Sequence, residues 1–223
     1  MPAKYRIDVL LALCAQALIV FAVFLPFYFI ETCAESEFLS QDRETRISLG
    51  FGIQVVDYSE ESSWGDGWNV SAAYGENAFP DVGPVMRTES ICLVLAILAM
   101  SLFLASRAFD MRSLSVALGL VAVGLCAVSM ANIGLTMADA AEDPGEWFVL
   151  NPWVPSWFSD ELDACVGFVG SEQTDSTVTR WGPSIGWWMI LVAGILQTVS
   201  VLVTIIASGW SCRKAVKQET VSR

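Results

Sequence analysis

The chain has 223 residues, of which 54% are hydrophobic and only 16% are charged, against roughly 25% charged residues in an average soluble domain. Its 24 acidic residues outnumber its 12 basic residues, and the net charge of −12 argues against a nucleic-acid partner, because such binding depends on Lys and Arg. The sequence contains no histidine, no CxxC pair and no nucleophile motif, so we expect no catalytic residue, no metal and no cofactor.

Four long apolar runs predict an integral membrane protein, because about 20 apolar residues cross the hydrocarbon core as a helix. We predict membrane spans at 9–30, 87–107, 113–137 and 185–208. The first run follows Lys4 and Arg6, as a cleaved secretory signal would, but it is longer than the about 7 to 15 residues usual for a signal. We therefore interpret it as an uncleaved anchor.

The charges between the runs predict the orientation of the chain. If both termini are cytosolic, the cytosolic side carries eight basic and three acidic residues, and the other side carries four basic and 21 acidic residues. Basic residues concentrate on the cytosolic side of membrane proteins. We therefore predict a cytosolic N-terminus at 1–8, an inner turn at 108–112 and a cytosolic tail at 209–223, and we expect the plasma membrane and a place at the cell surface.

The two predicted outer loops, 31–86 and 138–184, are long enough to fold. Apolar residues alternate through Arg46–Tyr58, which is the period of a half-buried strand, and Trp68–Tyr74 is a second candidate strand. The predicted fold is a four-helix transmembrane bundle with a small antiparallel β extracellular cap that both outer loops form.

Four residues are candidates for covalent modification. Cys33 and Cys165 lie one in each outer loop, and we predict a disulfide between them, although two separately buried thiols or a bridge to another chain would fit the same positions. Asn69 begins a glycosylation triplet on the predicted outer side, so the protein is a candidate glycoprotein. Cys212, next to basic residues after the fourth run, is either a lipidation site or an unmodified thiol at the membrane interface.

Tryptophans of the outer loops are candidate contact residues. They would meet lipid headgroups or a partner protein, and those of the second loop could instead pack against the first-loop sheet. The candidates are Trp64, Trp68, Trp147, Trp153 and Trp157.

The third run carries small residues at intervals of four or eight, namely Ser115, Gly119, Ala127 and Ala131. Small side chains let helix backbones approach closely in lipid. We predict that Gly119, Ala127 and Ala131 pack against other helices of the bundle, or else against a second copy of the chain.

Two stretches resemble a known superfamily. Ile47–Gln54 resembles the amastin pattern of apolar, Ser or Thr, Leu, aromatic, Gly, any residue and Lys, Arg or Gln, when Gly50 is counted as an insertion. Gly182–Trp188 resembles the glycine–glycine–tryptophan start of the fourth helix in claudin-like proteins. The layout is similar to that of claudins, peripheral myelin proteins and amastins, which implies four spans, cytosolic termini, a strand-rich first loop and a short inner turn. The cysteine pair of that family's first loop is absent here.

These features predict a non-enzymatic, claudin-like tetraspan that acts through its outer loops in adhesion, in surface structure or as an accessory subunit. Its expected partners are membrane lipids and other membrane proteins, in a hetero-complex or a homo-oligomer. No run carries an ionised side chain at its centre, which argues against a conduction path through one chain.

The alternative function is a cation-selective pore or channel component that uses acidic outer loops, because rings of carboxylates select cations. The candidate acidic residues form two groups, Asp57, Glu60, Glu61 and Asp66 in the first loop and Asp160, Glu161 and Asp163 in the second.

Overall fold

The computed structural model describes most of the chain and divides it into two compact units. The described residues are 7–38, 41–62, 67–75, 78–141, 162, 165, 167–174 and 176–221, and the side chains of 35–43 and 208–221 are not described. The helical unit comprises Met1–Val20, Cys92–Val128 and Met189–Arg223. The sheet unit comprises Phe21–Ile91 and Ser129–Trp188.

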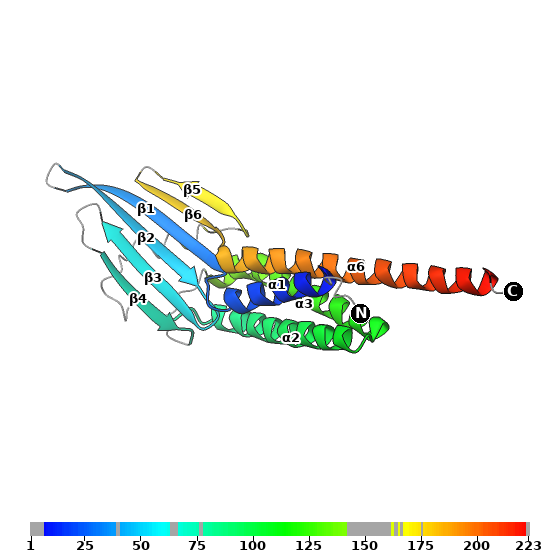
Figure 1. Ribbon diagram of the computed structural model, residues 1–223. Helices are drawn as coiled ribbons and strands as arrows, with labels where there is room; N and C mark the ends of the chain where they lie inside the picture. The colour runs from blue at the N-terminus through cyan, green and yellow to red at the C-terminus, as the bar shows by residue number, and fades with distance from the viewer. Residues whose placement is uncertain are drawn as a thin grey trace. The chain divides into compact units, whose positions relative to one another are not determined.

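The described residues form four helices, labelled in Figure 1: α1 (Ile7–Ala22), α2 (Val82–Ala108), α3 (Arg112–Ala141) and α6 (Ile185–Val221). Three of them, α2, α3 and α6, are long and apolar enough to cross a membrane. They contain the predicted spans 87–107, 113–137 and 185–208. The prediction of an integral membrane protein with transmembrane helices is therefore supported, and α6 continues 13 residues beyond the predicted end of its span at residue 208.

The first predicted span, 9–30, differs most from the structure. Helix α1 has 16 residues, about 24 Å of helix against the about 30 Å of a hydrocarbon core. After Ala22 the backbone tightens into i to i+3 hydrogen bonds, and Pro26 has no N–H to continue a helix. The aromatic and β-branched residues from Tyr28 onward then form a strand, for which such side chains have a high propensity. Hydropathy alone did not distinguish the helix from this strand.

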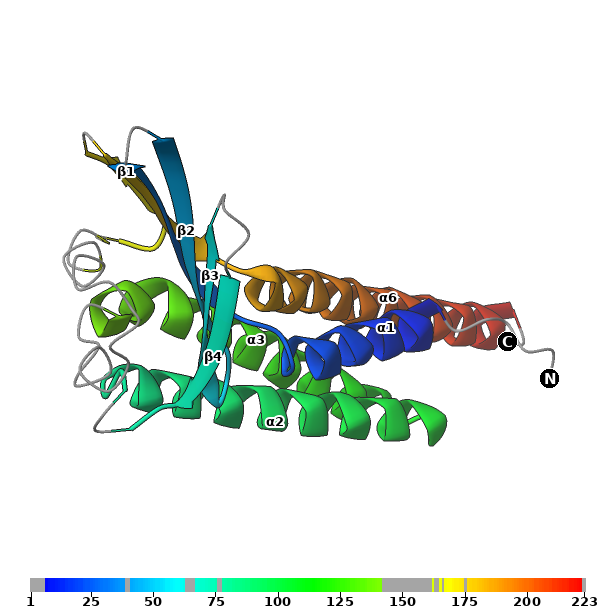
Figure 2. The same ribbon diagram turned by 90° about the vertical axis from the view of Figure 1, so that its left-hand side faces the viewer.

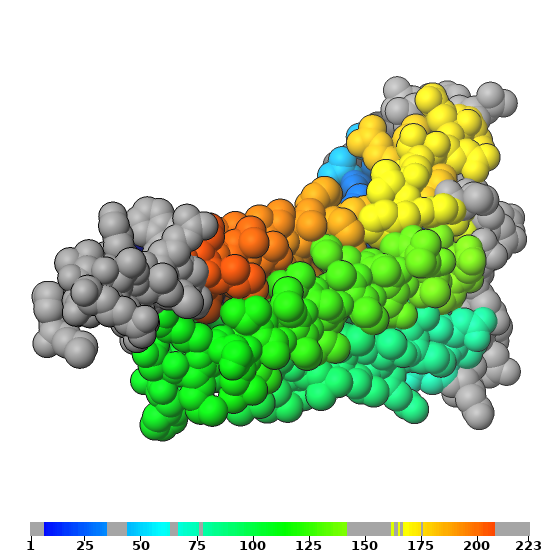
Figure 3. All heavy atoms as spheres, turned by 90° about the vertical axis from the view of Figure 1, so that its right-hand side faces the viewer, coloured from blue at the N-terminus to red at the C-terminus, as the bar shows by residue number. Residues whose placement is uncertain are grey.

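Within each helix the buried residues recur at alternating intervals of four and three, as in helices that pack side by side at a small angle. The buried positions in α1 are Asp8, Ala12, Ala15, Ile19 and Ala22, and those in α3 include Ser115, Gly119, Ala122, Cys126, Ser129 and Ile133. Gly119 is buried as predicted, whereas Ala127 and Ala131 are exposed. A constant spacing of four does not follow the alternating spacing of the buried face, so the prediction was wrong for the later positions. Figure 3 shows α6 lying against α3.

The helices bury polar side chains and expose large apolar ones. In the helical unit Gln197, Ser200 and Thr204 of α6 are almost completely buried. Large apolar side chains on the opposite surfaces are exposed, including Leu98, Leu102, Leu120, Val121, Ile195, Leu202 and Ile206. A surface of large apolar side chains around an interior that includes polar ones is expected where the helix surface meets lipid.

Among the described residues six antiparallel strands form one sheet with the order β4-β3-β2-β1-β6-β5. Figure 2 shows β1, β2, β3 and β4 in this order within the sheet. The strands are β1 (Tyr28–Phe38), β2 (Gln41–Phe51), β3 (Val55–Ser62), β4 (Gly67–Ala73), β5 (Gly170–Gln173) and β6 (Thr177–Pro183). The predicted antiparallel sheet is present. β1 pairs with β6, so the sheet joins the segment that follows α1 to the segment that precedes α6.

The predicted strand Arg46–Tyr58 is two strands of a hairpin. The chain turns at Gly52, whose N–H donates to the carbonyl of Val55 at 3.0 Å. The regular alternation of apolar residues did not reveal this turn. The buried residues have odd numbers in β2 (Ile47, Leu49 and Phe51), but even numbers in β3 (Val56 and Tyr58), so the alternation changes register at the turn.

One face of the sheet, the buried face, forms the core of the sheet unit. Its buried side chains include Tyr28, Ile30, Thr32, Ile47, Leu49, Phe51, Val56, Tyr58, Thr179 and Trp181. Aromatic contacts extend from this face: the ring of Phe51 meets Phe79 edge-on at 5.3 Å, and Tyr28 stacks on Phe168 at 6.3 Å. Phe168 in turn lies 5.3 Å from Trp187 at the start of α6. Aromatic packing therefore connects the sheet to the helix ends within this unit.

Replacement of Gly119 by Ala is expected to destabilise the protein by about 1–3 kcal/mol, since a Cβ there would lie 2.3 Å from Val201 Cγ2 and 3.2 Å from Phe103 Cδ2. The control is Gly124→Ala on the same helix, where a Cβ would meet nothing within 4 Å. Thermal unfolding of both variants in the same detergent tests the prediction. Equal unfolding temperatures for the two variants would contradict this packing.

Candidate functional site

The face of the sheet opposite the core, the open face, carries two rows of aligned side chains. In the first row Phe29 faces Gly50, Gly50 faces Asp57 and Asp57 faces Ser71 across four strands. The second row places Glu31, Ser48, Ser59 and Asn69 opposite one another in the same way. All these residues are exposed or half-buried. The alternation of side chains along each strand therefore gathers hydroxyl, amide and carboxylate groups on one surface.

A groove of about 420 Å³ lies on the open face, and all residues of the two rows except Glu31 line it. Gly50 leaves its floor without a side chain, and Pro26 and Phe29 supply an apolar wall. The Ser71 hydroxyl donates a hydrogen bond of 2.5 Å to Asp57 Oδ1. The groove can thus accept and donate hydrogen bonds beside an apolar surface. Among the residues that the structure describes, no group of three or more His, Cys, Asp or Glu side chains could hold a metal ion.

Charges of both signs interleave on the open face. Arg46 Nε lies 3.0 Å from Glu31 Oε1. The pKa of Arg46 is raised, mainly by a hydrogen bond with the Cys33 side chain and also by the charge of Glu31. The register sets Glu61 opposite Arg46 and Glu31 opposite Arg180. The surface is therefore not uniformly acidic.

The first predicted acidic group is divided between the two faces of the sheet. Asp57 and Glu61 belong to the open face, whereas Glu60 accepts hydrogen bonds from Trp68 Nε1 at 2.8 Å and from the Tyr58 hydroxyl at 3.1 Å. Burial and the Glu60 carboxylate raise the pKa of Tyr58. Asp66, Asp160, Glu161 and Asp163 lie outside the described residues.

The predicted disulfide between Cys33 and Cys165 is not formed in the structure, which has both residues as thiols. Cys33 points to the face opposite Tyr28, because the two residues are separated by an odd number of positions on β1. Cys165 lies close enough to Tyr28 to act electrostatically on its hydroxyl. Tyr28 is five residues from Cys33, which is about 17 Å along the strand. The expectation failed because loop membership does not determine the face on which a cysteine lies.

The other predicted site residues have different outcomes. Trp68 packs on Tyr58, with ring centroids 4.8 Å apart, so it contacts its own sheet. Asn69 is exposed on β4 and lines the groove. Cys212 lies in α6, and its side chain is outside the described set. The predictions for Trp64, Trp147, Trp153 and Trp157 fall outside the described residues.

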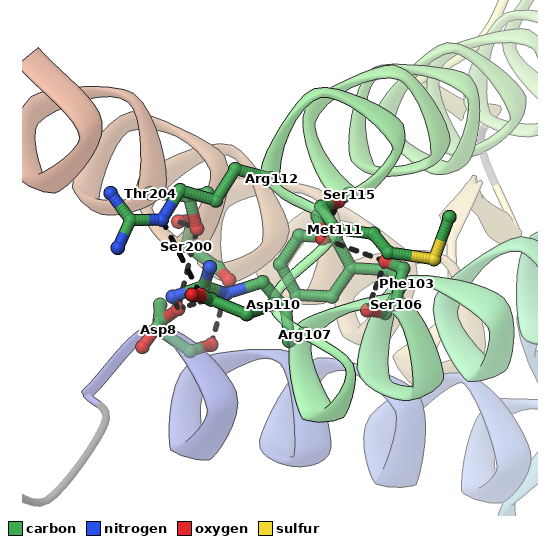
Figure 4. A network of polar contacts seen from close by, with 10 residues as sticks. All are labelled: Asp8, Phe103, Ser106, Arg107, Asp110, Met111, Arg112, Ser115, Ser200 and Thr204. Atoms are coloured by element: carbon green, nitrogen blue, oxygen red, sulfur yellow. Dashed lines mark hydrogen bonds and ion pairs between the residues drawn. The ribbon is translucent and has the colours of Figure 1, made fainter.

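A buried polar network in the helical unit joins three helices (Figure 4). Arg107 of α2 contacts Asp8 Oδ2 of α1 through Nη2 at 2.5 Å and Nε at 2.6 Å. From α6, the Ser200 hydroxyl donates to the backbone carbonyl of Asp8 at 2.7 Å, and Thr204 Oγ1 lies 3.4 Å from Asp8 Oδ2. Asp8 and Arg107 lie at the ends of apolar stretches in the sequence, and the predicted site residues did not include them. Their positions on the buried stripes of α1 and α2 carried the signal.

No protein-family model matches this chain, and a search of curated proteins likewise finds no match.

Arg107→Gln is expected to lower the unfolding free energy by about 3–5 kcal/mol, because it leaves the Asp8 carboxylate buried without its cation. Arg112→Gln is the matched control, since Arg112 and Asp110 form a pair with side chains 41% and 61% exposed, which is worth about 0–1 kcal/mol. Denaturant unfolding of both variants provides the comparison. If the two losses are equal, the buried pair does not hold the helices together.

The sheet unit is expected to lose stability in alkali through Tyr74. Its hydroxyl lies 2.7 Å from the carbonyl oxygen of Gly52 and 2.8 Å from that of Val55. Burial is the main cause that raises the pKa of Tyr74 above the ordinary value of 10.0, and the charge of Asp57 adds to it. Folding therefore favours the protonated form, so this contribution is complete below about pH 10 and decreases as the pH rises above it.

Unfolding temperatures measured from about pH 9 to about pH 11 test this dependence. Tyr74→Phe is expected to be less stable by about 1 kcal/mol at neutral pH and to show a smaller alkaline loss. An alkaline loss as large as that of the natural chain would exclude Tyr74 as its source.

Proposed function

We propose that the protein is a non-enzymatic, four-span membrane protein that binds another membrane protein through the open face of its sheet. The observation that carries this proposal is the groove, where aligned polar side chains from β2, β3 and β4 stand beside an apolar wall. Adhesion, surface structure and an accessory role in a larger complex all use such a binding surface.

The proposal of four spans rests on the packing of α1. Although α1 is short, Ala12 lies in one buried cluster with Phe103 of α2 and Val201 of α6. A helix that packs among membrane-spanning helices shares their layer. The apolar residues from Val23 to Phe27 would complete the crossing as an irregular segment.

The proposed orientation keeps both termini in the cytosol of a cell whose plasma membrane holds the protein. The excess of basic residues near 1–8, 108–112 and 209–223 supports it. The sheet would then face the exterior, where a partner on the same or a neighbouring cell is accessible.

The claudin-like resemblance is consistent with this assignment. Four strands lie in or next to the predicted first loop, and only Phe109, Asp110 and Met111 separate α2 from α3. These features support the strand-rich first loop and the short inner turn that the resemblance implies.

The open face favours a binding role over the alternative of a cation-selective pore. A selectivity ring needs carboxylates without compensating cations. Here Arg46 neutralises Glu31, and Asp57 accepts a hydrogen bond from Ser71 of the same sheet.

Ser59→Arg, which fills the groove, is expected to reduce co-purification of the partner at least tenfold. The control is Glu172→Arg, because Glu172 is exposed on β5 and does not line the groove. Quantitative mass spectrometry of native-membrane pull-downs measures the effect, after thermal unfolding has shown that both variants fold.

A partner retained equally by both variants would contradict the role of the groove. Cation flux through the purified protein in liposomes, abolished by Asp57→Asn, would instead support the pore.

A further inference from the structure

The helices bury a third charged residue, Glu89, in addition to Asp8 and Arg107 of the ion pair. Glu89 of α2 is completely buried, on the stripe of α2 that also buries Val82, Met86 and Leu93. In the sequence Glu89 lies two residues before the uninterrupted apolar stretch that begins at Ile91, near the start of the predicted span 87–107. Its place on the buried stripe shows that it faces the packed side of the helix.

The position of Glu89 along α2 places it at membrane depth. Leu95 is the midpoint of the 27-residue helix, and Glu89 is six residues away, about 9 Å along the axis. Half of a typical hydrocarbon core is about 15 Å. A helix centred in the bilayer therefore holds Glu89 within the hydrocarbon layer, whereas Arg107, about 18 Å from the midpoint, reaches the interface.

Helix α3 supplies the hydrogen-bonding surroundings of Glu89. The Ser129 hydroxyl donates to Glu89 Oε1. One turn further along α3, Asn132 Nδ2 donates to the carbonyl oxygen of Val85, 3.1 Å away and one turn before Glu89. Both contacts join α2 to α3 around the carboxyl group.

The second carboxyl oxygen has no partner. Glu89 Oε2 is buried and makes no hydrogen bond with any described residue, and none of the ion pairs in the described part of the chain includes Glu89. The other charged residues on the helix segments of the sheet unit are Arg87 and Asp139, and both are exposed. The segments of α1 and α6 in this unit, 21–22 and 185–188, carry no charge.

We propose that Glu89 is a proton-binding site within the membrane, at which the carboxyl group is held as the neutral acid between α2 and α3. A carboxylate at this depth would need a cation or several hydrogen-bond donors. The structure provides the Ser129 hydroxyl and the neighbouring Asn132 amide, and no ion pair among the described residues includes Glu89. A proton supplies the missing charge and occupies no additional space. This assignment goes beyond partner binding and does not depend on the groove.

Carbodiimide labelling tests the proposal on the full-length natural chain in lipid vesicles. The O–H of a protonated carboxyl adds across a C=N bond of dicyclohexylcarbodiimide, and the adduct rearranges to a stable N-acylurea without a leaving group. This reagent partitions into lipid, so Glu89 is expected to be labelled, and labelling is expected to fall about tenfold per pH unit above the titration midpoint. Peptide mass spectrometry locates the label.

The exposed Glu61 is the internal control, because a water-soluble carbodiimide with an added amine should label it and spare Glu89. Glu89→Gln should lose the label from its peptide, but the main readout needs no variant. Absence of label at Glu89 in vesicles, with label appearing after unfolding, would overturn the proposal. Suppression of labelling by sodium but not by choline at constant pH would also overturn it, in favour of a metal-cation site.

Discussion

The sheet unit depends on the antiparallel pairing of β1 with β6. This ladder continues beyond the strands, because Ser184 N–H donates to the carbonyl of Phe27 and Gly186 N–H to that of Pro26, both at 2.9 Å. A Cβ at Gly186 would lie 2.8 Å from the Pro26 carbonyl oxygen, so glycine permits this approach. The pairing makes a single sheet from two loops distant in sequence. The rows of the open face lie on β1 to β4, next to this pairing.

A different principle governs the helices. Lipid removes the hydrophobic drive that assembles helices in water, so close approach and polar contacts must hold them together. Gly119 provides the close approach, and the pair of Asp8 and Arg107 and the contacts of Ser129 and Asn132 provide the polar links. Each of these residues other than Asn132 is almost completely buried, and exposed leucines and valines cover the outside of the helices.

The sequence predicted the apolar helices and an antiparallel sheet because hydropathy and alternation are local signals. It failed where the outcome depends on tertiary contacts. The hydropathy of the run from Val9 to Ile30 is compatible with either a helix or a strand at its end. Pairing of this end with β2 and β6 makes it a strand. The facing rows of the groove arise from strand register, and the burial of Glu89 arises from the face of α2 that packs. A single sequence carries neither directly, although the alternating three- and four-residue spacing was present in it.

The position of Asn69 in the second row of the open face has a consequence for handling the protein. Its side chain stands opposite Ser59, and the same hollow includes Ser71, the third residue of its triplet. A sugar chain attached there would fill the hollow from within the molecule. An oligosaccharide on Asn69 and a docked protein could not occupy the groove together. Protein from a host that glycosylates Asn69 would therefore have a filled groove, and protein from a host that does not would have an open one.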